Sequence, residues 1–244
     1  MPLLPEFSPT VPSLHYGQVH LWFLDVNQFG ERHQQQAHHL MNADEHERAR
    51  KFMRGKEEYI ASRWLQRKVL GRYLDQAPEL VTISRAAKGK PFISNSDLRF
   101  NLSHSGNWVV LALAREVELG VDIEQIKKGR DLLSIAESYY HPDEFAQLQQ
   151  FTDPAAKIDF FYQLWTLKEA LLKALGVGIS AGLEKAHFRI EHNAVTANIA
   201  PELDTGNTWQ FGQWRLSDNF HCALATSGTE VLQTHWLDAI ALLD

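Results

Sequence analysis

The chain has 244 residues, of which 44% are hydrophobic and 22% are charged, and this composition predicts one large or two small globular domains. Disordered and fibrous classes are excluded, and the single cysteine, Cys222, excludes a disulfide scaffold. The net charge is −6, so the basic excess typical of nucleic-acid-binding proteins is missing. Because no apolar run approaches the roughly 20 residues of a membrane span and no secretory signal is visible, we expect a cytoplasmic protein that binds neither nucleic acid nor membrane.

The first part of the chain mixes strand-like and helical patterns. Asn42 is a typical helix cap, and Asp44 and Glu45 after it suit the positive end of the helix dipole. In chain order the residue spacing predicts an extended tail over 1–14, a strand over 16–26, a loop or frayed helix over 28–39, helices over 43–54 and 57–75, a short strand over 79–85, a loop over 86–97, and strands over 98–105 and 107–114 joined at Gly106.

The second part also alternates between strands and helices. The predicted elements are a strand over 118–124, helical segments over 131–151 broken at Pro142, a long helix over 155–175 stopped by Gly176, and strands over 187–191, 207–216 and 219–226. The pentapeptide FLDVN at 23–27 resembles GVDIE at 120–124. This repeat is consistent with two similar α+β halves, over 1–110 and 111–244, with an internal pseudo-dimer that would make a monomer sufficient.

Two sets of residues in the second half combine carboxylates with a cation. Asp122 and Glu124 lie two apart on a predicted strand, so their side chains share one side and could hold a hard cation, unless they form a solvent-facing polar edge. Glu169 and Lys173 lie four apart on the long helix, beside the apolar Trp165. They form either an ordinary exposed helix pair or a site that binds a metal and neutralises phosphate.

Three other segments contain candidate binding residues. Ser103 and His104 lead from a strand into a glycine turn, where a hydroxyl, an imidazole and backbone N–H groups suit a phosphate, although a plain turn histidine is the alternative. The loop Lys88–Pro91 is basic but lacks the spacing of a P-loop, so it either contacts phosphate or is simply solvated. The histidines at 33, 38, 39 and 46 lack zinc-site spacing, which favours a plain polar segment over a metal site.

Taken in order, these pieces resemble the 4′-phosphopantetheinyl transferases of the long, Sfp-like type. Similar stretches are GKP at 89–91, FNLSHSGNWVVLAL at 100–113, LGVDIE at 119–124 and FFYQLWTLKEALLKALGVGIS at 160–180. The segment over 43–70 is similar with a looser register. The family pattern, a G-[IV]-D strand followed about forty residues later by [FW]-[ST]-x-K-E-[AS]-x-x-K, is met by Gly120–Asp122 and Trp165–Lys173.

The resemblance implies an α+β fold of two similar halves with coenzyme A in a cleft between them. It also implies an enzyme that moves the 4′-phosphopantetheine arm of coenzyme A to a serine of an apo acyl or peptidyl carrier protein and releases adenosine 3′,5′-bisphosphate. Asp122, Glu124 and Glu169 would hold Mg²⁺, with Mn²⁺ as a possible substitute, and Glu169 would take the serine proton. Lys173 would neutralise phosphate or the departing oxygen.

The remaining site residues follow from the same resemblance. Ser103, His104, Lys90, Arg48 and Arg63 would contact coenzyme A. A further acidic position, Glu144, would lie near the metal or the incoming serine, while Glu45 stands where some relatives have a basic residue. Because the enzyme is itself acidic, we expect a local patch to bind the acidic carrier, formed either by Lys127, Lys128 and Arg130 or by the apolar helices over 132–151.

Two alternatives to an active transferase are a non-catalytic relative that binds coenzyme A or the carrier, and another Mg²⁺-dependent phosphoryl-transfer enzyme such as a nuclease. The first is disfavoured because Asp122, Glu124, Glu169 and Lys173 are all present. The second explains the carboxylates but not the ordered set of motifs, and the net charge disfavours nucleic acid.

Overall fold

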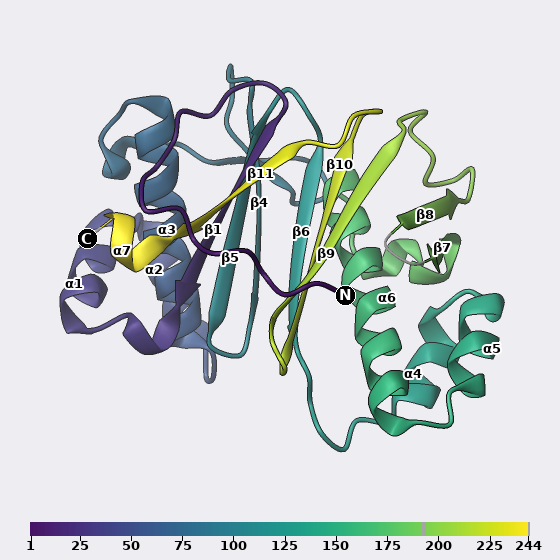
Figure 1. The fold of residues 1–244 in the computed structure, drawn as a ribbon. Helices are drawn as coiled ribbons and strands as arrows, with labels where there is room; N and C mark the ends of the chain where they lie inside the picture. The colour runs from purple at the N-terminus through teal and green to yellow at the C-terminus, as the bar shows by residue number, and fades with distance from the viewer. Residues whose placement is uncertain (192–193, 244) are drawn as a thin grey trace. The chain divides into compact units, whose positions relative to one another are not determined.

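A computed structural model describes residues 1–191 and 194–243 and confirms the α+β class (Figure 1). The chain forms two compact units, which we name after their longest helices. The α3 unit comprises Pro5–Ser84, Pro91–Arg115 and Leu232–Asp244, and the α6 unit comprises Met1–Leu4, Arg85–Lys90 and Glu116–Val231. In the described part of the chain, no helix has the length and apolar character that crossing a membrane requires.

The α3 unit is built on a four-stranded sheet with the order β11-β1-β5-β4. Strand β1 (Gln18–Asp25) pairs antiparallel with β5 (Trp108–Arg115) and parallel with β11 (Gln233–Asp238), and β5 pairs antiparallel with β4 (Leu98–Ser105). The unit also contains α1 (Glu31–Leu40), α2 (Ala43–Lys51), α3 (Lys56–Leu74) and α7 (Ala239–Leu243). Trp22 of the sheet and Trp64 of α3 are fully buried in the core of this unit.

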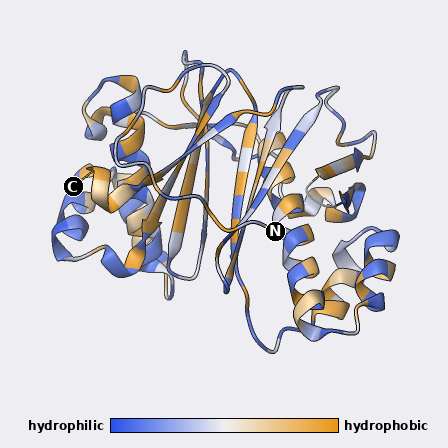
Figure 2. Ribbon diagram, viewed as in Figure 1, coloured by the Kyte–Doolittle hydropathy of each residue, from blue (hydrophilic) through white to orange (hydrophobic). Residues whose placement is uncertain are grey.

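The α6 unit is built on a three-stranded antiparallel sheet in the order β6-β10-β9, with α6 (Pro154–Leu175) packed against it. The strands are β6 (Leu119–Gln125), β9 (Trp209–Ser217) and β10 (Phe220–Ser227). A two-stranded sheet of β7 (Ala186–Glu191) and β8 (Ala194–Ile199) and the helices α4 (Leu132–Tyr139) and α5 (Pro142–Gln150) complete the unit. Figure 2 shows hydrophobic and hydrophilic bands alternating along α6, because this helix packs one side on the sheet.

Short segments complete the chain. They are the 3₁₀ helices η1 (Val26–Gln28), η2 (Pro78–Leu80), η3 (Ile179–Ala181) and η4 (Leu183–Lys185), and a hairpin of β2 (Ser84–Arg85) and β3 (Pro91–Phe92).

Local sequence signals set several element ends. Asn42 and Glu45 form a reciprocal capping box, in which each side chain accepts a hydrogen bond from the backbone N–H of the other, at 2.9 and 3.0 Å. Helix α6 begins after Asp153, whose carboxylate accepts two backbone N–H groups, and ends at Gly176, which has a φ of 69°. The predicted caps at Asn42 and Gly176 are therefore confirmed.

The structure differs from the sequence prediction in four places. Residues 31–40 form a regular helix, α1, where a loop or frayed helix was predicted. Its sequence is almost entirely polar, and the helix is stabilised by packing, because Ala37 and His33 are buried. Strand β8 and the C-terminal pair β11 and α7 were not predicted, and the strand expected over 79–85 is a 3₁₀ helix followed by only two strand residues.

The unit boundary also differs from the predicted halves 1–110 and 111–244. Position 110 lies in the middle of β5, whose residues on both sides of it pair with β1 and β4, so the first long segment of the α3 unit runs on to Arg115. The C-terminal Leu232–Asp244 returns to this same unit because β11 pairs with β1.

Candidate active site

The site in the α6 unit begins with an unusually close contact between β6 and α6. A Cβ atom on Gly120 would lie 2.1 Å from the carbonyl oxygen of Ala170 and 2.4 Å from the backbone nitrogen of Ala174. Only glycine allows the two backbones to approach this closely. Since side chains alternate along a strand, Asp122 and Glu124 point from β6 to the same side as this contact.

Asp122 pairs directly with the helix. Its side chain is buried, and its Oδ1 accepts a hydrogen bond from Nζ of Lys173 at 2.7 Å, while the same ammonium donates to the carbonyl oxygen of Val121 at 3.3 Å. A charge-assisted hydrogen bond of this length is strong and fixes both side chains. The alternative of a solvent-facing polar edge is therefore excluded for Asp122.

Glu169 lies one turn before Lys173 on α6. Burial raises the pKa of this carboxyl to about 7, the negative charges of Asp122 and Glu124 add to the rise, and Lys173 opposes it. The electrostatic effect of both acidic residues on Glu169 shows that the predicted carboxylates gather in one place. The structure thus brings Asp122, Glu124, Glu169 and Lys173 together.

This group of residues fits a hard divalent cation. Three carboxylates and one ammonium leave the group negatively charged when every member is ionised. The raised pKa of Glu169 means that this carboxyl ionises less readily here than in water. Mg²⁺ is held in proteins by a few carboxylates together with phosphate oxygens and water. Asp122, Glu124 and Glu169 are suitable oxygen ligands for such an ion.

In the α3 unit, the two candidate arginines meet at one aromatic ring. The guanidinium carbon of Arg63 lies 5.3 Å from the centre of the Tyr59 ring, and that of Arg48 lies 5.9 Å from it. Arg48 is exposed on α2 and Arg63 is half-buried on α3. Cation–π contacts of this kind help to orient guanidinium groups, and Nε of Arg63 also donates to Oγ of Ser62 at 3.4 Å.

Glu45 and the pair Ser103–His104 have defined places in the α3 unit. Glu45 forms a largely buried ion pair with Arg67 at 2.9 Å. Ser103 and His104 lie at the end of β4, as expected, and the turn that follows contains Gly106 with a φ of 55°. Ser103 is buried and His104 is exposed, because successive strand residues face opposite sides.

Lys90 lies in the α6 unit with its ammonium engaged inside the protein. Its Nζ donates to Glu118 at 2.5 Å and to the carbonyl oxygen of Ala174 at 2.6 Å, near the C-terminus of α6. The structure therefore gives Lys90 a helix-capping contact. Its expected contact with the nucleotide stays a prediction.

Glu144 lies in the interior of the α6 unit. It forms an ion pair with Lys168 at 2.7 Å in which both side chains are fully buried. Its oxygens also accept hydrogen bonds from the backbone N–H groups of His141, at 2.9 Å, and Phe188, at 2.7 Å. None of these contacts involves the three proposed metal ligands, so they support a structural role in place of the predicted one near the metal or the serine.

Sequence reasoning gave Lys168 and Gly120 no role, although both stand in the motifs. Nζ of Lys168 also donates to the carbonyl oxygens of Leu183 and Ala186, and burial lowers its pKa while Glu144 raises it. The burial of Lys168 could have been inferred from the sequence, because this residue stands among apolar residues of α6. The signal for Gly120 was a glycine inside a strand, which often marks a close backbone approach.

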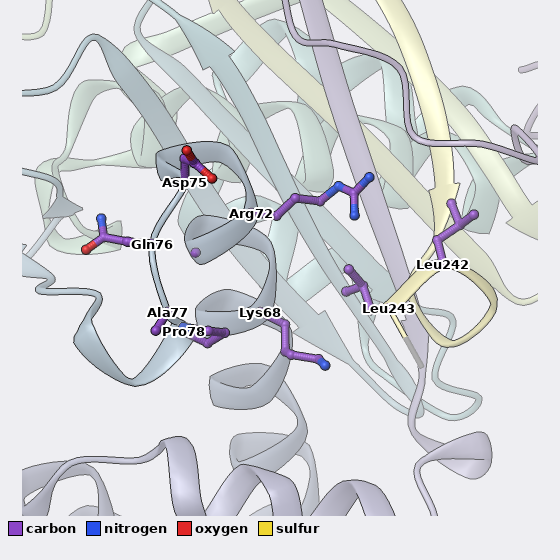
Figure 3. A pocket seen from close by; sticks show the side chains of 9 residues that line it. Lys68, Arg72, Asp75, Gln76, Ala77, Pro78, Leu242 and Leu243 are labelled. Carbon is purple, nitrogen blue, oxygen red and sulfur yellow. The ribbon is translucent and has the colours of Figure 1, made fainter.

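A separate cavity of about 590 Å³ lies in the α3 unit, at the C-terminal end of α3 (Figure 3). Lys68 and Arg72 of α3 line it together with the C-terminal Leu242 and Leu243. None of the predicted site residues belongs to its lining.

Two family models match the chain. Residues 118–225 match the 4′-phosphopantetheinyl transferase superfamily, and residues 30–116 match the N-terminal domain of 4′-phosphopantetheinyl transferase. The 4′-phosphopantetheinyl transferase HetI of Nostoc is 33% identical over 217 residues, which cover 86% of this chain and 88% of HetI. A putative 4′-phosphopantetheinyl transferase of Synechocystis is 31% identical over 205 residues, which cover 80% of this chain and 82% of the relative.

Among solved structures, a holo-(acyl-carrier-protein) synthase of Bacillus anthracis in complex with coenzyme A has a TM-score of 0.40 and 16% identity, and the match covers 46% of this chain and 96% of that one. The sequence matches span both units, and the motif residues Asp122, Glu169 and Lys173 lie together in the structure. This chain belongs to the 4′-phosphopantetheinyl transferase family.

Proposed function

We propose that the chain transfers the 4′-phosphopantetheine arm of coenzyme A to a serine of an apo acyl or peptidyl carrier protein. The observation that carries this proposal is the pairing of Asp122 with Lys173 beside Glu169, within a chain that belongs to the transferase family. A carboxylate group and an adjacent ammonium suit a reaction that cleaves a pyrophosphate bond.

In the proposed reaction, the serine oxygen forms a bond with the phosphorus that carries the pantetheine arm. The bond from this phosphorus to the bridging oxygen breaks, and adenosine 3′,5′-bisphosphate leaves with the electron pair. Asp122, Glu124 and Glu169 would hold Mg²⁺, or Mn²⁺, which neutralises charge on the pyrophosphate when bound.

Glu169 and Lys173 have the two remaining roles in the proposed reaction. A carboxylate whose pKa is about 7 is a stronger base than an ordinary one, so Glu169 is suited to accept the serine proton. Lys173 is fixed by Asp122 and Val121, which places a positive charge beside the carboxylates for the departing oxygen. Arg48, Arg63, Ser103, His104 and Lys90 are proposed to contact coenzyme A.

The test is intact-protein mass spectrometry of a panel of apo carrier proteins mixed with coenzyme A, Mg²⁺ and the enzyme. We expect a phosphopantetheine-sized mass gain on at least one carrier, and no gain when a chelator is present. Asp122→Ala and Glu169→Ala should abolish the gain without unfolding the protein, whereas Glu202→Ala, at an exposed position of the same unit, should leave it intact. Full transfer by both site variants would contradict the metal assignment.

The carrier is proposed to dock on one of two surfaces of the α6 unit. Lys127 and Lys128 are exposed, and Arg130 lies over the Trp165 ring with its guanidinium carbon 5.6 Å from the ring centre. The helices over 132–151 expose Leu133 and Tyr139. Reversal of the three basic charges should weaken carrier binding without changing coenzyme A binding, and unchanged carrier affinity would remove the basic patch from the proposal.

Location and assembly are part of the same proposal. Cys222 is buried as a free thiol, which suits a reducing cytoplasm. We propose that the chain works there as a monomer on coenzyme A and carrier proteins, with no nucleic-acid or membrane partner. Sedimentation of the purified enzyme at assay concentration tests the monomer, and a dimer would overturn it.

A further inference from the structure

A second group of side chains that could hold a metal lies in the α6 unit and includes none of the proposed magnesium ligands. His141 and Asp143 come from the start of α5, and His187 comes from β7. One ligand atom of each residue lies within 4.8 Å of the other two. Oδ2 of Asp143 is 3.6 Å from Nδ1 of His141 and 4.0 Å from Nε2 of His187. Neighbouring ligands on a tetrahedral zinc ion are about 3.3 Å apart, given metal–ligand bonds of about 2.0 Å.

The two histidines are held near one another by a buried group. Glu144 accepts the backbone N–H of His141 with one oxygen and the backbone N–H of Phe188, the residue after His187, with the other. Glu144 is itself fixed by the fully buried ammonium of Lys168. One anchored carboxylate therefore sets the spacing of the two backbones that carry the imidazoles, as an outer layer of residues does around known metal sites.

The two imidazoles stack against each other beside Asp143. Nδ1 of His141 accepts a hydrogen bond from the backbone N–H of Asp143 at 3.3 Å, so this nitrogen carries a lone pair on the side of the carboxylate. The two rings stack with centroids 4.1 Å apart and an angle of 3° between their planes. Lone pairs lie in the ring planes, and these planes are parallel, so one ion can bind both imidazoles only after the His141 ring turns out of the stack and releases the Asp143 N–H. The side chain of His141 is 35% exposed, which leaves it room to turn.

We propose that His141, Asp143 and His187 form a binding site for a divalent transition metal, with Zn²⁺ as the favoured ion. Two imidazoles and one carboxylate are ligands that Zn²⁺ accepts in three-ligand sites, whereas Mg²⁺ prefers oxygen atoms. The site is thus chemically distinct from Asp122, Glu124 and Glu169. A bound ion would join α5 to β7 and stabilise the folded α6 unit. This inference does not depend on the proposed transferase activity.

The experiment is a Zn²⁺ titration of the whole, metal-stripped protein in a large excess of Mg²⁺, with a chromogenic chelator as competitor and imidazole ¹⁵N chemical shifts as a residue-specific readout. We expect one equivalent of Zn²⁺ to bind and to shift the ring signals of His141 and His187. His141→Asn keeps a good helix cap, and Asp143→Ala changes an exposed side chain, so both variants should fold. Each should weaken Zn²⁺ binding at least tenfold.

The matched control is His46→Asn. His46 stacks on His38 with centroids 5.6 Å apart, so this variant breaks another histidine pair and should leave Zn²⁺ affinity unchanged. Equal Zn²⁺ affinity of wild type and His141→Asn would overturn the proposal. So would displacement of the bound Zn²⁺ by Mg²⁺, because the ion would then belong to the carboxylate group.

Discussion

Replacement of Gly120 by alanine tests how the carboxylate site is positioned. The added Cβ would lie 2.1 Å from the carbonyl oxygen of Ala170, which is about 1.3 Å short of an ordinary van der Waals contact. Both atoms nearest to the new methyl group belong to the backbone of α6, so no side-chain rotation can relieve the clash. The helix and β6 must therefore move apart.

The size of this movement determines the expected effects. A separation of about 1.3 Å would lengthen the contact between Asp122 and Lys173 from 2.7 Å to about 4 Å, which no longer forms a hydrogen bond. Overpacking of this kind costs about 1–3 kcal/mol of stability. A displacement of about 1 Å at reacting groups can cost roughly 100-fold in rate. We thus expect a folded variant with a large loss of activity.

The assay compares Gly120→Ala with Gly178→Ala, measuring both the rate of carrier modification and the free energy of unfolding in urea. Gly178 has a φ of −85°, and a Cβ there would contact only the Ser180 hydroxyl at 3.8 Å, so alanine is tolerated at this position. We expect the Gly178 variant to resemble wild type in both measurements. A Gly120→Ala enzyme with wild-type rate and stability would refute the argument that this contact positions the site.

Three further predictions follow from other contacts. Lys173→Ala should lower kcat more than coenzyme A affinity, and a loss of affinity alone would make Lys173 only a binding residue. Lys168→Met leaves the carboxylate of Glu144 buried without a cation, so it should lower the free energy of unfolding in urea by about 3–5 kcal/mol. The double variant with Glu144→Gln should recover part of this loss, and losses that simply add would refute the coupling. Burial, together with His235 and His15, lowers the pKa of His20 from 6.5 to about 4, so below pH 6.5 the unfolded chain takes up a proton that the folded chain does not. The free energy of unfolding should fall by about 2 kcal/mol between pH 7.5 and pH 5, and the same fall in His20→Gln would contradict this.

Much of the fold could be predicted because its signals are local. The cap at Asn42, the stop at Gly176 and the alternation in β1 each depend on residues within a few positions of one another. Strand β11 could not be found in this way, since it is defined by its parallel pairing with β1 more than 200 residues earlier. Helix α1 was missed because its stability comes from packing and its sequence has little apolar periodicity.

In the candidate site too, local features could be predicted from the sequence and long-range contacts could not. The spacing of Asp122 and Glu124 placed them on one side of a strand. The contact between Asp122 and Lys173 joins residues 51 positions apart. Only the family resemblance placed both residues at one site, and it did not predict that they pair directly. The acidic character of Glu144 gave no indication that a buried Lys168 would pair with it. Charged residues are usually exposed, so a buried pair is a property of the tertiary structure.

The two roles proposed for Glu169 make opposite demands on its carboxyl group. A metal ligand must be ionised, whereas a base at neutral pH needs a pKa well above the ordinary value near 4.5. Burial and the charges of Asp122 and Glu124 raise this pKa to about 7, while Lys173 opposes the rise. A cation held by the same carboxylates lowers it again, because a positive charge favours the ionised form. Glu169 would therefore keep more of its basicity if Asp122 and Glu124 were the main ligands of the metal. Asp122 and Glu124 both lie on β6, whereas Glu169 lies on α6. This arrangement allows the two strand residues to act as ligands while Glu169 acts as the base.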